Sequence, residues 1–344
     1  MGEHTGPAIA QSLLQPQDIQ NGQTNGTAIN GEYRHDPLRE TSDSEPEMNG
    51  HKSTRPVYPV KRPVHSPSRI QWLWDALELL CSMRGHGWDY GALVYVPPRT
   101  ASYYHRRTFL LHSLRNTVVY FFLLDFLESL AKLVPGVGSP RGGSIFLASE
   151  DLPYIPHVSE SVVRYSMSTL ISLMSGTGVM AGFNAVYGLL SLIGVGILHQ
   201  DPRIWPPPFH SPFLSTSLNE FWAKRWHQIL RRPFLIYGGL PFAYIASLLP
   251  FPKSTRKTVD QIATVLGAFL ASGLYHEVGS LAMGRSWDSR VVWFFVMHGW
   301  LVIFERVWRR LSGRRVGGLA GTLWVYFWVI GVGQLCSKFQ HFEI

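Results

Sequence analysis

Several long apolar segments follow the first 66 residues of the chain and constrain its fold more than any other feature. They are rich in Leu, Val, Phe and Trp and cover residues 117–134, 162–198, 234–249, 258–284, 291–304 and 319–335. A helix of about 20 apolar residues crosses the roughly 30 Å hydrocarbon layer of a membrane. Because a helix satisfies its own backbone polar groups in lipid, the sequence predicts an all-α, multi-pass transmembrane helical bundle.

Residues 1–66 differ sharply in composition from the rest. Tyr33 and Tyr58 are their only aromatic residues, among many Gly, Asn, Ser, Pro and Gln. Such a segment buries too little apolar surface to fold, so we expect a disordered tail. It masks the membrane character of the chain, whose mean hydropathy is only +0.03. We place the membrane domain at residues 67–344.

Charge, targeting signals and cysteines narrow the class further. The net charge of +8 is carried by the membrane domain, which suits anionic lipid headgroups or a phosphorylated cofactor, and we expect no nucleic-acid partner. The first 30 residues contain no apolar run typical of a secretory signal peptide. Cys81 and Cys336 are the only cysteines, which excludes a disulfide framework and a cysteine-based metal site.

Three segments carry specific topological expectations. Residues 162–198 are too long for one straight crossing, so we expect a break at Ser175–Gly178. Asp125 and Glu128 interrupt the first segment and should face protein or a watery cavity if it spans. Basic residues at 224–232 and at 306–315 should both lie on the cytosolic side, which requires an even number of crossings between them. We therefore expect residues 234–249 to be re-entrant and to help form an internal chamber.

The segment 217–233, SLNEFWAKRWHQILRRP, should form a helix too polar to span. Ser217 and Glu220 form a capping box at its start and Pro233 marks its end. At helical spacing, Trp222 and Trp226 share one face, while Lys224, His227 and Arg231 share another. That pattern is typical of an interfacial amphipathic helix, so a membrane-surface anchor is the simplest interpretation.

His276 lies past the middle of the apolar segment 258–284 and is followed by Glu277. Ionisable groups inside a membrane are functional candidates, because burying a charge at its centre costs about 2.5–3.5 kcal/mol. Small residues share the helix face of His276, among them Ser272 and Gly273, and would leave room for a reacting group. Small residues also let membrane helices pack tightly, so a purely structural histidine stays an alternative. His298 is more readily explained as a satisfied histidine of the bundle.

Two strings in these segments resemble one enzyme family. FWAKRWHQ at 221–228 and ASGLYHE at 271–277 are together similar to the wax synthase branch of the membrane-bound O-acyltransferase family. RGHGW at 84–88 is similar to an element that precedes them in that family. The polar tail and the short set of spans resemble most the fungal acetyltransferases of secondary metabolism. The resemblance covers about residues 70–335.

The resemblance implies transfer of an acyl group from acyl-CoA to a hydroxyl inside a membrane chamber, with no permanently bound cofactor and no metal. It places the intramembrane histidine of the family at His276 and its second polar position at His227. A neutral imidazole is suited to accept the hydroxyl proton, while His227 would stabilise the oxyanion or orient the acceptor. The remaining candidates for substrate contacts are Lys224, Arg225, Trp226, Arg231, Ser272 and Gly273.

The expected acceptor is a lipophilic, terpenoid-like alcohol, the expected acyl group is acetyl, and the expected location is the endoplasmic reticulum. A wax ester synthase acting on long-chain alcohols is the alternative within the family. Outside it, a transporter or lipid-binding protein would show similar broken helices, although no internal repeat is visible. The chain has no G-x-S-x-G, H-x-x-x-D or H-E-x-x-H string, which favours direct transfer over a covalent intermediate.

Overall fold

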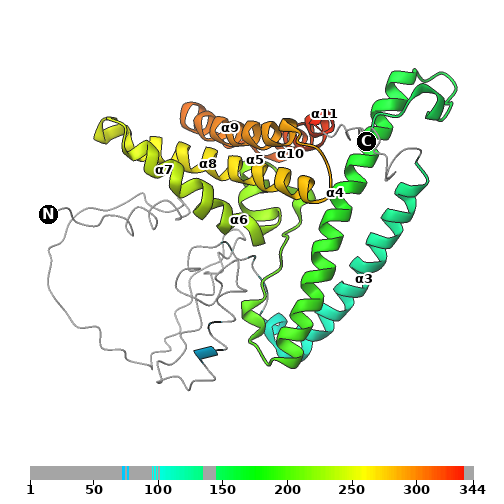
Figure 1. Ribbon diagram of the computed structural model, residues 1–344, viewed down its shortest axis with the longest axis horizontal. Helices are drawn as coiled ribbons and strands as arrows, with labels where there is room; N and C mark the ends of the chain where they lie inside the picture. Colours follow the sequence, from blue (N-terminus) through cyan, green and yellow to red (C-terminus); the bar gives the residue numbers. More distant parts are fainter. Residues whose placement is uncertain are drawn as a thin grey trace, which may run out of the picture.

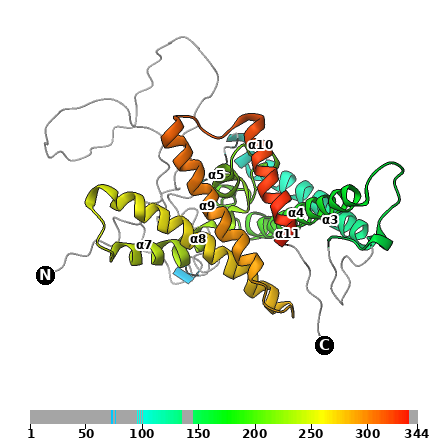
Figure 2. The same ribbon diagram turned by 90° about the horizontal axis from the view of Figure 1, so that it is seen from above.

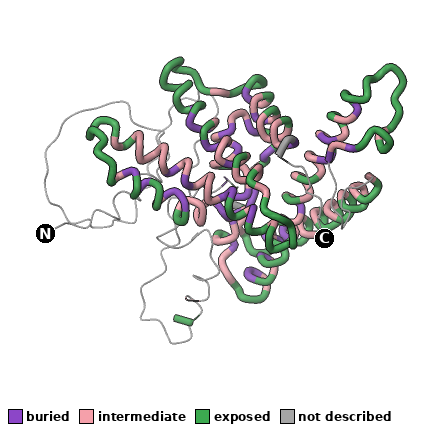
Figure 3. Tube along the Cα trace, turned by 45° about the horizontal axis from the view of Figure 1, so that its top comes forward, coloured by how far each residue is buried: buried purple, intermediate pink, exposed green. Residues whose placement is uncertain are grey.

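The computed structural model describes residues 101–134 and 145–336, together with residues 72, 73, 76, 95, 97 and 99. The expected tail at 1–66, Cys81 and the RGHGW string at 84–88 lie outside this part of the chain. The described residues are helical, as the sequence predicts, and contain no strand. Most of the buried positions lie where the helices meet (Figure 3).

Residues 133–159 separate α3 from α4 and residues 193–217 separate α4 from α5, whereas the later helices follow one another with short connections. Their bounds are α3 Arg106–Lys132, α4 Glu160–Leu192, α5 Leu218–Glu220, α6 Gln228–Phe234, α7 Leu240–Ser247, α8 Lys253–Ala282, α9 Ser289–Ser312, α10 Gly318–Tyr326 and α11 Gly333–Cys336. Four π-helical turns extend or join them, at Ile193–Ile197, Phe221–Arg225, Leu235–Gly239 and Phe327–Val332. Short 3₁₀ turns lie at Ala101–Tyr104, Ser149–Asp151, Pro202–Ile204 and Pro212–Leu214.

Helices α3 and α4 form a long antiparallel pair that is inclined to the other helices (Figure 1). Helix α4 runs without interruption through 175–178, so the expected break is wrong. Glycine lowers helix stability by only about 1 kcal/mol and does not by itself end a helix. Further along α4, Gly188 serves helix packing, since a Cβ atom on it would lie 2.3 Å from Thr117 Oγ1 of α3. With its π turn the helix has 38 residues, about 57 Å, longer than one perpendicular crossing requires.

The two acidic residues of α3 do not face the protein interior. Asp125 and Glu128 are both exposed, and Glu128 forms an ion pair with Lys132 at 2.7 Å. The expectation that packing or a cavity covers them is therefore wrong for the described part of the fold. Both acids lie in the last two turns of α3, where a helix end can reach the polar edge of a membrane.

Helices α7, α8 and α9 pack side by side and form the second part of the fold (Figures 1 and 2). The backbones of the π turn Leu235–Gly239 and α8 approach closely, because a Cβ atom on Gly238 would lie 2.1 Å from the Gly267 carbonyl oxygen. Gln334 of α11 links this part to α4, since its Nε2 donates to Thr169 Oγ1 at 2.8 Å. Leu218, Phe221, Val302 and Val325 form the core cluster between α5, α9 and α10.

Four described helices are long and apolar enough to cross a membrane: α3, α4 with its π turn, α8 and α9. Only α8 and α9 among them lie between the two basic segments, so an even number of candidate spans separates those segments. The segment 234–249 lies in shorter helical pieces and is not one of the four. The arrangement agrees with the expected multi-pass bundle, and the re-entrant position of 234–249 stays a prediction.

Candidate functional site

The segment 217–233 is not one continuous helix, which corrects the sequence-based expectation. Ser217 Oγ accepts a hydrogen bond from the Glu220 backbone N–H at 3.0 Å, so the predicted helix start is confirmed. The chain leaves the helix at Trp226, whose backbone is extended, and resumes at Gln228. A second correction concerns Pro233, which lies inside α6 and does not end it.

The break has a tertiary cause in the preceding proline-rich loop. The Gln228 backbone N–H donates to the Pro208 carbonyl at 2.8 Å, and the His210 N–H donates to the Arg225 carbonyl at 2.9 Å. These two bonds hold the backbone of 225–228 against the loop, in place of the bonds that would continue the helix. The turn places His227 and Trp226 at the end of α8 that carries Ser272 and His276.

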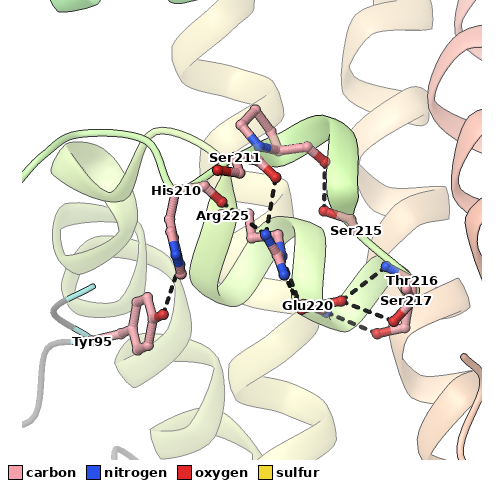
Figure 4. A network of polar contacts seen from close by, with 9 residues as sticks. Tyr95, His210, Ser211, Ser215, Thr216, Ser217, Glu220 and Arg225 are labelled. Carbon is pink, nitrogen blue, oxygen red and sulfur yellow. Dashed lines mark hydrogen bonds and ion pairs between the residues drawn. The ribbon is translucent and has the colours of Figure 1, made fainter. Parts of the chain in front are cut away.

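Arg225 is engaged in a polar network that holds this loop (Figure 4). Its Nη2 lies 2.7 Å from Glu220 Oε1, and its Nη1 donates to the carbonyls of His210 and Ser211 at 3.2 and 3.0 Å. Burial acts to raise the pKa of Glu220, but hydrogen bonds from Thr216 and Arg225 lower it overall. The network ties the segment 216–225 to the loop, so Arg225 has a structural task and is not directed at the cavity described below.

Glu305 of α9 holds the start of the same segment. It is 6% exposed and accepts hydrogen bonds from the backbone N–H groups of Leu218 and Asn219 at 2.7 and 2.9 Å and from Trp324 Nε1 at 3.1 Å. A carboxylate at the first turn of a helix satisfies donors that would otherwise have no partner. Sequence analysis missed Glu305, although an acidic residue in an apolar helix is a visible signal.

A cavity of about 130 Å³ lies between the segment 219–235, α8 and α9. It is lined by Asn219, Trp222, Ala223, Trp226, His227, Arg231, Phe234, Leu235, Val265, Ala268, Phe269, Ser272, Val302 and Arg306. Four of the sequence-based candidates, Trp226, His227, Arg231 and Ser272, are therefore brought together at one cavity. Trp222, Phe269 and Arg306 are lining residues that the analysis of the sequence did not select.

His227 and His276 lie next to one another beside this cavity. Their ring centroids are 6.3 Å apart, and His227 is 7% exposed. His276 is one helical turn beyond Ser272 and is not itself a lining residue, so the cavity reaches His227 first. His276 Nε2 is buried and has no hydrogen-bond partner among the described residues.

Phe295 of α9 holds the ring of His276. The two rings are stacked with centroids 4.7 Å apart and an interplanar angle of 7°. Gly273 permits this approach, because a Cβ atom there would lie 2.9 Å from Val292 Cα and 3.4 Å from Phe295 Cβ. Gly273 thus serves helix packing and does not line the cavity. Lys224 is exposed and does not line it either.

Lowering the pH from 7 to 4 should destabilise the protein through His227, which lies outside the four candidate spans. Burial, with a smaller contribution from His276, lowers the pKa of His227 from 6.5 to about 4. Between these values the unfolded chain binds a proton that the folded protein does not. The free energy of unfolding therefore decreases as the pH is lowered through this window, by roughly 3 kcal/mol in total.

The measurement is the thermal unfolding of purified protein at a series of pH values. His227→Gln removes this titrating group and should make the dependence between pH 6.5 and 4 shallower, while the other histidines still contribute to it. The loss of stability from Glu220 at lower pH should remain, because the folded-state pKa of this carboxyl is lowered. Equal slopes for both proteins between pH 6.5 and 4 would contradict the assignment to His227.

Comparison with known proteins identifies the segment that forms this site. Residues 205–297 match the membrane bound O-acyl transferase family. The chain is 24% identical over 269 residues to the acetyltransferase eriL of Hericium erinaceus, which covers 76% of this chain and 64% of that protein. It is 28% identical over 166 residues to the acetyltransferase spyB of Aspergillus fumigatus, and the aligned part covers 42% of this chain and 27% of that protein. The identity to the long-chain-alcohol O-fatty-acyltransferase of Simmondsia chinensis is 31% over 135 residues, which cover 38% of this chain and 36% of that protein.

The aligned parts cover less than two thirds of the length of each of these relatives. The family match nevertheless contains the whole functional segment, from the loop before Trp222 through the two histidines. The helical fold with its four candidate spans is that of a membrane protein. Over residues 205–297 the chain is therefore similar to the membrane bound O-acyl transferase family, and the relatives named above are acyltransferases by name.

Proposed function

We propose that this protein transfers an acetyl group from acetyl-CoA to a hydroxyl of a lipophilic, terpenoid-like alcohol. The oxygen of the alcohol attacks the thioester carbonyl carbon, the carbon–sulfur bond breaks, and an ester and CoA are formed. His276 accepts the hydroxyl proton and returns it to the leaving sulfur. His227 donates a hydrogen bond to the oxyanion that forms on the carbonyl oxygen.

The observation that carries this proposal is the pair of imidazoles beside the cavity. His276 Nε2 has no partner among the described residues, so its bonding capacity is available to a substrate. His227 is neutral above pH 4 and therefore keeps both a donor and an acceptor nitrogen at neutral pH. Two neutral imidazoles 6.3 Å apart can serve the two oxygens of one reacting centre.

The size of the cavity favours a short acyl group. A dry cavity of about 150 Å³ holds a benzene molecule, and the cavity here measures about 130 Å³. A two-carbon acetyl group fits wholly within such a space, whereas a sixteen-carbon chain would extend beyond it. The relatives eriL and spyB are acetyltransferases by name, which supports the same choice over the long-chain-alcohol activity of the Simmondsia relative.

Two cations at the cavity are suited to the phosphates of CoA. Arg231 of α6 and Arg306 of α9 both line the cavity and belong to the two basic segments expected on the cytosolic side. Guanidinium groups bind phosphate with two parallel hydrogen bonds. In this proposal Arg231 and Arg306 bind the CoA phosphates, Lys224 adds charge at the surface, and Arg225 positions the loop. The enzyme acts in the membrane of the endoplasmic reticulum.

The direct test is transfer by membranes that contain the protein, with acetyl-CoA and palmitoyl-CoA compared on the same panel of alcohols. We expect kcat/KM to favour acetyl-CoA by at least about 100-fold, because the cavity excludes the longer chain. Product is measured as ester by mass spectrometry, with membranes lacking the protein as the control. Exclusive use of palmitoyl-CoA would reverse the choice of acyl group. Movement of alcohol across the membrane without any ester would favour the transporter alternative.

A further inference from the structure

A third histidine, His298 of α9, lies beneath the cavity and takes no part in the proposed transfer. It is 0% exposed. His298, Val302 and Arg306 are spaced four residues apart and share one face of α9, and the latter two line the cavity. The indole of Trp222 also lines the cavity and lies edge-to-face on His298, with centroids 5.4 Å apart at 76°. Trp222 therefore contacts both the cavity and His298.

The hydrogen bond at one ring nitrogen defines what the other can do. His298 Nδ1 lies 2.8 Å from the carbonyl oxygen of Phe294. A carbonyl oxygen only accepts, so Nδ1 carries the hydrogen of the neutral ring. Nε2 is then an acceptor, and it is buried without a partner among the described residues.

Trp222 supplies the complementary group. Its Nε1–H can only donate, and this atom too is buried without a partner in the described part of the chain. The two nitrogens do not bond to each other, although their rings are in contact. Folded proteins rarely leave buried polar groups unpaired, so each such group calls for a partner such as a water molecule, an ion or a bound ligand. An unpaired donor and an unpaired acceptor on adjacent rings form an incomplete site.

We infer that Trp222 and His298 bind a second, non-reacting hydroxyl of the acceptor alcohol. A hydroxyl is the small neutral group whose single oxygen both accepts and donates, as this pair requires. A carbonyl oxygen would satisfy only Trp222, and an ammonium group would satisfy only His298. The inference rests on the proposed function and defines its acceptor more closely, as a molecule with at least two hydroxyls.

Phe295 keeps the two hydroxyl positions separate. Its ring is stacked on His276 with centroids 4.7 Å apart and contacts the ring of Trp222 with centroids 5.7 Å apart. Phe295 therefore lies between His276 and the pair Trp222–His298. The reacting hydroxyl lies with His276 and the second with His298. The acceptor must therefore carry its two oxygens at a defined spacing.

The test uses the full chain, acetyl-CoA, and linear α,ω-diols of four to eight carbons, each compared with the 1-alkanol of equal length. We expect one diol length to show a kcat/KM about tenfold above its 1-alkanol, after division by two for its equivalent hydroxyls. That factor corresponds to the net contribution of about one hydrogen bond. Trp222→Phe and His298→Phe should each reduce this ratio of diol to 1-alkanol to about one.

Two further variants separate recognition from packing. His298→Gln offers an amide oxygen near the position of Nε2 and should restore part of the preference. Trp226→Phe changes another tryptophan that lines the cavity, but Trp226 Nε1 is not one of the unpaired atoms. This variant should keep the full preference. An unchanged ratio in Trp222→Phe and His298→Phe, or an equal loss in Trp226→Phe, would overturn the inference.

Binding separates this inference from the proposed function. Calorimetry with the purified His276→Ala protein should show tighter binding of the selected diol than of its 1-alkanol, by about the same tenfold factor. Adding Trp222→Phe should remove the difference. If wild type forms no ester with any acceptor, the proposed function fails while this binding difference still decides the role of Trp222 and His298. Equal binding of diol and 1-alkanol by His276→Ala would overturn the inference that Trp222 and His298 bind a second hydroxyl.

Discussion

Replacing His276 by Ala should lower the rate of ester formation by about 10²- to 10⁴-fold, the usual contribution of a positioned general base. The His276 ring is stacked on Phe295 with centroids 4.7 Å apart, which fixes its orientation. Its Nε2 forms no hydrogen bond with any described residue and is therefore not engaged in a structural role. No nearby group replaces it, because His227 is oriented towards the oxyanion in the proposed mechanism. The measurement is the initial rate of ester formation, normalised to the amount of protein in the membrane.

A suitable control is His105→Ala, which changes an exposed histidine outside the site that makes no side-chain capping bond at the start of α3. This variant should transfer acetyl groups at the wild-type rate. Comparable abundance of both variants excludes a folding defect as the cause of lost activity. Wild-type turnover by His276→Ala at normal abundance would eliminate the general-base assignment and with it the proposed mechanism.

Gly267→Ala should cause the largest loss of stability among conservative substitutions in α8. An ideal Cβ atom at this position would lie 2.3 Å from the Gly238 carbonyl oxygen and 2.7 Å from Phe242 Cβ. The first contact is with backbone, which cannot move aside like the end of a side chain, so the two helices must separate. Overpacking a close contact typically costs 1–3 kcal/mol and occasionally more. The expected result is a lower unfolding temperature of the purified protein and reduced abundance in membranes.

The same helix provides a matched control in Gly279→Ala. A Cβ atom on Gly279 meets nothing within 4 Å, so the added methyl group causes no clash. Alanine is favoured over glycine inside a helix by about 1 kcal/mol, and this variant should be as stable as wild type or slightly more so. Equal stability of the two alanine variants would show that α8 and the turn 235–239 do not approach as closely as described.

The site residues differ in how well the sequence predicts them. His276 is conspicuous because an ionisable residue in an apolar segment needs an explanation, and resemblance to the family placed His227 with it. Ser272 shares the helix face of His276, and Trp226 and Arg231 belong to the polar segment 217–233. The structure brings these residues to one cavity or beside it. Lys224, Arg225 and Gly273 do not line that cavity, although the same strings contain them.

Arg225 shows why local pattern was insufficient. In a continuous helix it would project beside the other cations of 224–232, but its partners are Glu220 and the carbonyls of a loop fifteen residues earlier. The Pro208 carbonyl and the His210 N–H of that loop also bond to the backbone of Gln228 and Arg225, where the helix is interrupted. Spacing within 217–233 carries no information on bonds to the loop, so the predicted single amphipathic helix failed at this point.

The sequence by itself determined the helical class, most of the candidate spans and the position of His276 within a long apolar helix. Each of these follows from short-range pattern, since a lipid environment requires apolar residues over a fixed length and penalises a lone ionisable group. The tertiary structure alone decided which face of α8 meets the segment 219–235, the stacking of Phe295 on His276, and the pairing of Trp222 with His298. Those contacts join residues far apart in the chain, and their geometry depends on close approach of backbones at Gly267 and Gly273.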